Sequence, residues 1–537
     1  MSRIVVVGSG ASGVHFALSA LSNGHDVTML DVGFQAPHVV EPEASFEALK
    51  ERLDDPVTYF LGPNAERVVY PSATSKHFGF PASKDYVFSR VPSARVASRG
   101  FEPLLSFARG GLAEAWTGGC YEFGDAQLER FPISFADLRP HYAEVARRVG
   151  ISAERDDIER FSPFTAPYLP PLAIDEHSRR LLLRYGARRT QLNAALGFFL
   201  GRSRVATLSL DRQGRGACAN LGRCLWGCPR GSLYTPSLTL RECLRSERFT
   251  YLSGQFVTHF HYDTSGRVTS VISRSLESGS RLESAGDLVV LAAGALGTSR
   301  LYLESIRRRE GRIVQLSGLM DNPHAVVPFV NWEHLGRPVR TASYQFHLLA
   351  IGLAADDGSP EGHGQITTLR AASVHPIVQN LPFDLRAGAS VFRRIRSALG
   401  VANVWAPGNR RAEHVVTLRT TDTGAVELVL DCAPDTESVR RLSRLAVRVR
   451  RALSRFGCTA PAGMTQILPL GSSVHYAGTL PMTEDAGEHT CDRHGRVRGF
   501  QNLIVADGAA FPSLPATNLT FTLMANAARI AESLGAA

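Results

Sequence analysis

The chain has 537 residues, which exceeds the usual ceiling for one hydrophobic core and predicts two or more domains or one large enzyme fold. Hydrophobic residues make up 44% of it and charged residues 20%, the composition of an ordinary soluble globular protein rather than a disordered one. The net charge of +9 is spread as arginine, without a zinc finger or an aromatic-interleaved basic stripe, so we expect no nucleic-acid partner.

The number of cysteines and the hydropathy of the sequence indicate the cellular compartment of the protein. Eight cysteines are too few for a disulfide scaffold in so long a chain, and a strand predicted from residue 3 leaves no room for a signal peptide. No apolar run approaches the ~18 residues of a membrane-spanning helix, so we expect a cytoplasmic protein without integral membrane contact. Cys218, Cys224 and Cys228 lack a fourth ligand for zinc or an iron–sulfur cluster, so a packing role is favoured and no metal is expected.

The first 31 residues predict a strand, a tight turn, a helix and a second strand. Ile4 to Val7 are the short, all-apolar run of a strand buried on both faces. Gly24 is expected to end the helix, and the second strand, "DVTMLD", follows it. The helix shows apolar residues at helical spacing, namely Val14, Ala17, Leu18 and Leu21.

The turn after the first strand has the pattern Gly8-x-Gly10-x-x-Gly13. Gly8 permits the turn, Gly10 lets a pyrophosphate approach the backbone, and Gly13 brings the helix close to the strand. The free N–H groups at the start of the helix, around Ala11 and Ser12, can hold the phosphates. This pattern between strand and helix predicts a Rossmann-like dinucleotide-binding domain of the α/β class.

Asp31 ends the second strand, about 20 residues beyond the glycines. A carboxylate there can hold the ribose hydroxyls of a dinucleotide. It disfavours a 2′-phosphate, because two negative charges would meet. The pattern alone fits both NAD and FAD.

Two segments rich in small residues follow in the middle of the chain. "ARGGLAEAWTGGC", residues 108–120, is a glycine-rich run. "DLVVLAAGALGTSRLYLES", residues 287–305, predicts a buried strand, a turn of small residues and a helix that begins near Thr298. Small residues let backbone pass close to a ligand. The family resemblance described below implies that the binding residues in these segments are Gly110, Gly111, Trp116, Thr117, Ala293 and Gly294.

Three further elements are predicted between residues 381 and 457. "HVVTLRTTDTGAVELVLD" is typical of an antiparallel hairpin in a sheet that roofs a ligand. Residues 381–405 contain a basic amphipathic stretch with exposed Phe392 and Ile395, which indicates a surface helix or, alternatively, a lid or a membrane- or partner-binding surface. An amphipathic helix ends before Gly457, with Val439, Leu442, Leu445, Ala446 and Val449 on its apolar face.

The C-terminal block holds the candidate catalytic residues. "SSVHYAGTLPM" places His475 among small residues, and Asp507, Gly508 and Asn518 follow. Considered alone, a histidine is most often structural, and Thr517 or Asn518 could be the N-cap of the last helix.

Together these segments resemble the glucose–methanol–choline (GMC) oxidoreductases, a family of FAD enzymes. Residues 108–120 are similar to a flavin-contacting loop of pyranose oxidases, in which a histidine at the place of Ala115 becomes covalently attached to FAD. The resemblance therefore implies a non-covalent FAD, with Thr117 near the reactive edge of the flavin. It also implies that the turn at residues 293–294 lies near the FAD diphosphate. "LMDNPHAV" resembles the family's Asp-His-Pro loop, with Asn322 in place of histidine.

The C-terminal block resembles the block that carries the catalytic pair in cholesterol oxidases and pyranose oxidases. The shared pattern is a histidine in His-x-x-Gly-Thr, then Asp-Gly, then an asparagine in the spacing of Asp507 to Asn518. The resemblance implies that His475 removes the hydroxyl proton of an alcohol while the hydride passes to flavin N5. Asn518 is then expected to donate its amide N–H to the same oxygen.

Because the flavin-binding segments are dispersed, we expect the FAD-binding domain to comprise residues 1–130, 205–315 and 465–537. Residues 131–204 and 316–464 would form an α+β substrate-binding domain with a large antiparallel sheet.

The expected function is FAD-dependent oxidation of a small-molecule alcohol, favouring a secondary hydroxyl of a sugar, glycoside or other polyol. A sterol-like or aliphatic alcohol is the alternative substrate. A flavoprotein with lyase, isomerase or structural use of FAD and an NAD-dependent enzyme are the alternative functions. The sequence does not reveal the electron acceptor. It shows no fused haem or iron–sulfur domain.

Overall fold

A parallel sheet forms the first layer of the fold. The computed structural model describes residues 1–36, 43–62, 81–369 and 382–535. In this part of the chain, five parallel strands pair in the order β19-β9-β1-β2-β5. They are β1 (Arg3–Val7), β2 (Asp26–Leu30), β5 (Phe249–Leu252), β9 (Leu288–Leu291) and β19 (Leu503–Val505).

Both faces of the parallel sheet are covered, which explains why its first strand is apolar throughout. Ile4 and Val6 pack with α1 (Ala11–Ser22), α9 (Pro236–Cys243) and α14 (Thr520–Glu532). Val5 and Val7 point the other way, into the cluster that contains α10 (Ala295–Glu310). The predicted strand-turn-helix-strand unit is confirmed, with Gly24 at φ +84° after the end of α1.

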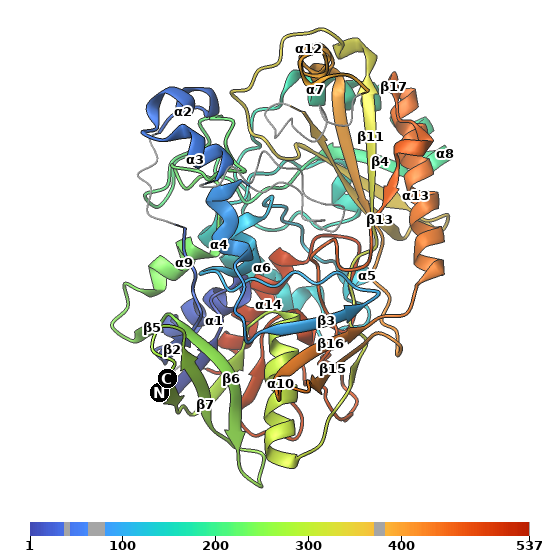
Figure 1. Cartoon of the computed structure of the whole chain (residues 1–537). Helices are drawn as coiled ribbons and strands as arrows, with labels where there is room; N and C mark the ends of the chain where they lie inside the picture. Colours follow the sequence, from blue (N-terminus) through green and yellow to red (C-terminus); the bar gives the residue numbers. More distant parts are fainter. Residues whose placement is uncertain (37–42, 63–80, 370–381, 536–537) are drawn as a thin grey trace.

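A seven-stranded antiparallel sheet forms the other half of the molecule (upper half of Figure 1). Along β11, Ala325, Val327 and Phe329 are buried against α13 (Thr436–Arg455), while the alternate residues face the opposite side. Helices α7 (Glu176–Gly186) and α8 (Arg189–Leu196) join the same core. The strands are β4 (Phe198–Arg202), β11 (His324–Asn331), β12 (Leu349–Ala354), β13 (Pro360–Thr368), β14 (Leu399–Trp405), β17 (Cys458–Thr459) and β18 (Gln466–Ile467).

Two smaller sheets and short helices complete the described fold. A three-stranded sheet contains β6 (Gln255–Tyr262), β7 (Val268–Ser275) and β8 (Arg281–Ser284). A four-stranded sheet contains β3 (Arg95–Arg99), β10 (Leu316–Ser317), β15 (Val415–Thr420) and β16 (Val426–Asp431). The remaining α-helices are α2 (Phe46–Arg52), α3 (Pro56–Leu61), α4 (Asp85–Phe88), α5 (Asp125–Leu128), α6 (Phe135–Val149) and α12 (Leu385–Ile395). The expected α/β fold with a large antiparallel sheet is confirmed.

Four local expectations need correction. The predicted hairpin is β15–β16, but it pairs with β3 and β10 rather than with the seven-stranded sheet. Helix α10 begins at Ala295, before Thr298, because Gly294 at φ +78° turns the chain directly into the helix. Val439 was expected on the apolar face of α13, but it is 45% exposed. The buried face begins instead at Ser438, whose hydroxyl donates to Asp435. Phe392 is 3% exposed and lies on the inner side of α12.

The expected division into two domains stays a prediction. All five parallel strands fall within the ranges expected for the FAD-binding domain, and β4, β11, β12, β13 and β14 within those of the substrate domain. The four-stranded sheet takes strands from both sets of ranges.

Candidate functional site

One large cavity, of about 1860 Å³, lies between the carboxyl ends of the parallel strands and the face of the seven-stranded sheet opposite α13. This edge of a parallel sheet is where open α/β folds bind their ligands. Its volume exceeds the ~1,000 Å³ upper size of ordinary small-molecule sites, so a dinucleotide and a substrate fit together. The predicted residues that line it are Gly8, Gly10, Ala11, Ser12, Asp31, Gly110, Gly111, Trp116, Thr117, Ala293, Gly294, His475, Asp507, Gly508 and Asn518.

The three glycines of the first turn have different surroundings. Gly8 has φ +100°, and a Cβ on it would lie 2.6 Å from the carbonyl oxygen of Ala292. A Cβ on Gly13 would lie 2.0 Å from the carbonyl oxygen of Gly8, so Gly13 serves helix–strand packing and does not line the cavity. A Cβ on Gly10 would meet no protein atom within 4 Å, so the space beside it is open to a ligand at the N-terminus of α1.

Asp31 joins the first turn to the loop at residues 108–120. Its Oδ2 accepts hydrogen bonds from the hydroxyls of Ser9 and Tyr251, the latter at 2.9 Å. Ser9 Oγ in turn accepts the backbone N–H of Gly110 at 2.9 Å. Burial raises the pKa of Asp31 to about 6, while the two hydroxyls act to lower it.

The loop at residues 108–120 presents backbone and one hydroxyl to the cavity. Gly110 and Gly111 both have positive φ, of +94° and +65°. Trp116 Nε1 donates to the carbonyl oxygen of Tyr234 at 2.7 Å, which fixes the indole. The adjacent Thr117 is exposed and lines the cavity.

Asp507 ties the C-terminal block to the start of α10. Its Oδ2 accepts the hydroxyl of Thr298 at 2.5 Å and its Oδ1 accepts the N–H of Ala509 at 2.9 Å. A Cβ on Gly508 would lie 2.4 Å from the carbonyl oxygen of Tyr476, so only glycine lets these two segments approach. The block that contains His475 is thereby held beside the turn at residues 293–294.

Asn322 fixes one nitrogen of the His475 ring. Asn322 Nδ2 donates to the carbonyl oxygens of Ala406 and Pro515, at 3.0 and 2.9 Å. Its Oδ1 therefore faces His475 Nδ1, at 3.0 Å, and can only accept. The ring proton consequently lies on Nδ1.

Asn518 fixes the other nitrogen. Its Oδ1 accepts the N–H of Thr520, the first residue of α14, at 2.9 Å. Its Nδ2 lies 3.0 Å from His475 Nε2 and donates to it. The lone pair of His475 Nε2 therefore points at the side-chain N–H of Asn518. The expected pair is in contact, and Asn518 also binds the backbone at the start of the last helix.

The backbone around His475 is clamped by a buried carboxyl group. Asp321 is 2% exposed and accepts the N–H groups of Gly471 at 2.7 Å and of His475 at 3.2 Å, together with the hydroxyl of Ser473. Burial raises the pKa of Asp321 to about 7. These bonds hold Val474 at φ +61°, a conformation that a β-branched residue adopts only when its surroundings impose it.

His475 is neutral over the physiological pH range. Its ring opens partly to the cavity but lies deep in the protein, and this burial, with the nearby His324, lowers its pKa to about 3. A neutral imidazole whose Nε2 is unprotonated is a proton acceptor.

Comparison with known proteins shows which family the chain resembles. Residues 370–527 match the family model of the GMC oxidoreductases. The chain is 24% identical to paromamine 6'-oxidase from Streptomyces fradiae, over 99% of its own length and 91% of that protein. It is 23% identical to C-glycoside 3-oxidase from Microbacterium trichothecenolyticum, over 99% and 96%. The fold is similar to that of pyridoxine 4-oxidase from Mesorbium loti, with a TM-score of 0.59 and 15% identity over 99% of both chains.

The chain is similar to the GMC oxidoreductases, whose family model matches its residues 370–527. It is an FAD-dependent enzyme that oxidises alcohols. The cavity fits FAD on the evidence of its own residues, because the places of a Cβ on Gly10 and Gly294 are both free of protein atoms. The N-terminus of α1 and Asp31 supply the polar groups that a dinucleotide needs there.

Several residues of this site were not among the sequence-predicted site residues. Asn322 stood in the "LMDNPHAV" segment, but only the fold shows that its side chain meets His475. The sequence gives no sign of the role of Asp321, the residue before Asn322. The sheet residues His324, His363 and Trp405 also line the cavity, and strands give no local sequence sign of such a role.

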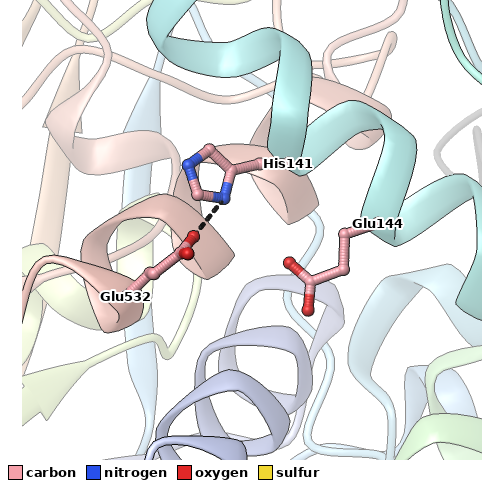
Figure 2. Close-up of side chains that lie close together, drawn as sticks. All are labelled: His141, Glu144 and Glu532. Atoms are coloured by element: carbon pink, nitrogen blue, oxygen red, sulfur yellow. Dashed lines mark ion pairs between the residues drawn. The ribbon is translucent and has the colours of Figure 1, made fainter. Parts of the chain in front are cut away.

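Another group of potential ligand atoms in the described residues lies outside the cavity. His141 Nδ1 on α6 contacts Glu532 on α14 at 3.2 Å, with Glu144 nearby (Figure 2). Burial lowers the pKa of His141 to about 4, so this contact joins a neutral imidazole to a carboxylate at neutral pH. Glu144 pairs with Arg148. The group therefore links two helices of the protein.

The remaining sequence expectations concern cysteines and membranes. Cys218 and Cys224 pack on the apolar cluster around Tyr344 and Leu348, as expected. Cys228, like them, forms no disulfide. Among the described helices, none combines the length and the apolar character needed to cross a bilayer.

Proposed function

We propose that this enzyme oxidises a secondary hydroxyl of a sugar, glycoside or other polyol to a carbonyl. The observation that carries the proposal is the contact of His475 Nε2 with Asn518 Nδ2, 3.0 Å apart in the wall of the cavity. The names of two relatives similar along nearly the whole chain, a paromamine 6'-oxidase and a C-glycoside 3-oxidase, support the sugar-like substrate.

His475 is the proposed base. Bound FAD supplies the hydride acceptor for the substrate C–H bond. His475 Nε2 takes the hydroxyl proton, and the Nδ1–H bond to Asn322 keeps the ring in the tautomer that can do so. In this structure, Asn518 Nδ2–H donates to His475. When the substrate oxygen lies between the two side chains, this N–H donates to the substrate oxygen instead. The negative charge that develops there favours the imidazolium as the proton arrives.

We propose that FAD is held without a covalent bond and that Thr117 lies near its reactive edge. Ala115, which lines the cavity, has no nucleophilic atom, and Thr117 is exposed beside the fixed indole of Trp116. Acid precipitation of the yellow protein tests the first point. Free FAD in the supernatant is expected, and flavin retained by the pellet would contradict it.

We propose a cytoplasmic location. The eight cysteines all lie in the described residues and form no disulfide there, which is typical of a reducing compartment. Measurement of the native protein's distribution between cytosolic and periplasmic or secreted fractions tests this proposal.

The substrate proposal is tested by anaerobic flavin reduction. The holoenzyme is mixed with a panel of methyl glycosides and C-glycosides, and with cyclohexanol and a sterol as apolar alcohols. Bleaching of the flavin by the glycosides, with a carbonyl product, is expected. Rapid bleaching by the apolar alcohols alone would overturn the sugar assignment.

A further inference from the structure

The cavity wall next to His475 is a row of three stacked rings from the seven-stranded sheet. Strand register places His324 of β11 and His363 of β13 on either side of Trp405 in β14. The ring of His324 lies 4.8 Å from the indole at an interplanar angle of 17°, and that of His363 lies 6.3 Å away at 23°. We call these three residues the His-Trp-His row.

The His-Trp-His row adjoins the proposed base. The centroid of the Trp405 ring lies 6.3 Å from that of His475, and all three members of the row line the cavity. Because imidazoles flank both faces of the indole, only the edge of Trp405 is left to meet a ligand. A molecule whose reacting hydroxyl is at His475 therefore has its neighbouring groups against the row.

Each ring of the row has a buried nitrogen without a hydrogen-bond partner among the described residues. These atoms are His324 Nδ1, Trp405 Nε1 and His363 Nε2. Buried polar atoms without partners are costly, and their clustering on one wall indicates that a ligand completes their hydrogen bonds. The sheet supplies none of these bonds from its own strands.

The three atoms call for different partners. His324 Nε2 donates to Asn403 Oδ1 at 3.0 Å, so His324 Nδ1 is an acceptor. Trp405 Nε1–H can only donate. A hydroxyl group both donates and accepts, so one hydroxyl can satisfy both rings, whereas a carboxylate or an ammonium group can satisfy only one.

The row is also uncharged at neutral pH. Burial lowers the pKa of His324 to about 4 and that of His363 to about 3, and His363 is 2% exposed. Asn403 and Gln365, which lie along the same strands, add neutral amides to this wall, and His347, His475 and Arg204 also lie near enough to act on His363. The wall therefore favours a neutral, hydroxylated ligand.

We propose that the His-Trp-His row binds the hydroxyl group next to the one that is oxidised, and that the enzyme thereby selects vicinal diols. The inference rests on the proposed function, because it needs the reacting hydroxyl at His475. It names Trp405, His324 and His363 as specificity-determining residues.

Two matched substrate analogues test the proposal: trans-1,2-cyclohexanediol and cyclohexanol, which differ by the second hydroxyl. Anaerobic flavin reduction by the wild-type holoenzyme is expected to show kcat/KM about tenfold or more higher for the diol. Trp405→Phe keeps the stacked ring but removes the N–H, so the ratio of the two values is expected to approach one. Trp332→Phe makes the same change at a residue that is 56% exposed outside the cavity, and should leave the ratio unaltered.

Binding of methyl glucoside to the reduced holoenzyme, which cannot oxidise it, gives a second readout. Trp405→Phe and His363→Phe are each expected to weaken it about tenfold. An unchanged diol preference and unchanged binding in folded variants would overturn the inference but leave the proposed function intact. If neither the diol nor any glycoside bleaches the wild-type flavin, the proposed function fails, and this inference fails with it.

Discussion

At the scale of single residues, two asparagines decide which nitrogen of His475 carries the proton. Asn322 is oriented by two backbone carbonyls and Asn518 by the N–H of Thr520, so neither amide is free to turn over. The proposed base is therefore already in the tautomer that can accept a proton before substrate arrives, which would remove a reorganisation step from the proposed reaction.

Asn322→Asp is the residue-scale test of that arrangement. In the wild-type enzyme, His475 has a pKa of about 3, so flavin reduction should not lose rate between pH 8 and pH 5 through this group. A carboxylate beside Nδ1 favours the imidazolium and raises this pKa. The protonated ring is not a base, so the variant's rate is expected to fall as pH drops through the raised pKa.

The measurement is the rate of anaerobic flavin reduction against pH, with thermal unfolding to show that the variant is folded. Asn23→Asp, outside the cavity, is the control and should keep the wild-type profile. Identical profiles for Asn322→Asp and wild type would show that Asn322 does not govern the ring.

At the scale of elements, two glycines in the turn from β1 into α1 have different roles: Gly13 allows close packing and Gly10 leaves space for a ligand. A Cβ on Gly13 would collide with the backbone of Gly8, so Gly13→Ala is expected to destabilise the apoprotein by about 1–3 kcal/mol. A Cβ on Gly10 meets only open space, so Gly10→Ala should leave apoprotein stability within about 1 kcal/mol while weakening FAD binding at least tenfold. Thermal unfolding of the apoproteins and FAD titrations measure the two effects, and undiminished FAD affinity in Gly10→Ala would place the diphosphate elsewhere.

At the scale of the whole molecule, buried histidines predict sensitivity to acid. A histidine whose folded pKa lies below the unfolded value of about 6.5 binds its proton more readily in the unfolded chain, so stability falls as pH drops through this window. The pKa values are about 4 or about 3 for His141, His259, His324, His363 and His475. Aspartates with raised pKa values act in the opposite sense, and those with values of about 6 to 7 are Asp31, Asp321 and Asp507.

Because these histidines outnumber these aspartates, Tm is expected to fall when the pH is lowered from 7 to 5. Differential scanning calorimetry of the apoprotein at constant ionic strength measures this. A Tm that rises over the same interval would mean that the carboxyl groups dominate.

The sequence predicted those parts of the molecule that leave a local pattern. Gly8, Gly10 and Gly13 are needed by the turn itself, and Asp507 to Asn518 lie on one short segment, so their spacing is visible without the fold. The start of α10 and the inward side of Phe392 were predicted wrongly, because small residues and surface helices give ambiguous patterns.

The parts that escaped prediction depend on strand register and long-range hydrogen bonds. His324, His363 and Trp405 come from three strands and meet only because those strands pair as they do. The contact of Asn322 with His475 crosses between distant segments in the same way. Such groupings have no signal in any one stretch of sequence.

The most direct measurement of the central claim is the rate at which a substrate glycoside bleaches the flavin in His475→Ala under anaerobic conditions. Loss of a general base is expected to slow this rate by about 10² to 10⁴, with FAD still bound. His261→Ala, an exposed histidine on β6 away from the cavity, should react at the wild-type rate. Equal rates in His475→Ala and wild type would contradict the assignment of His475 as the base.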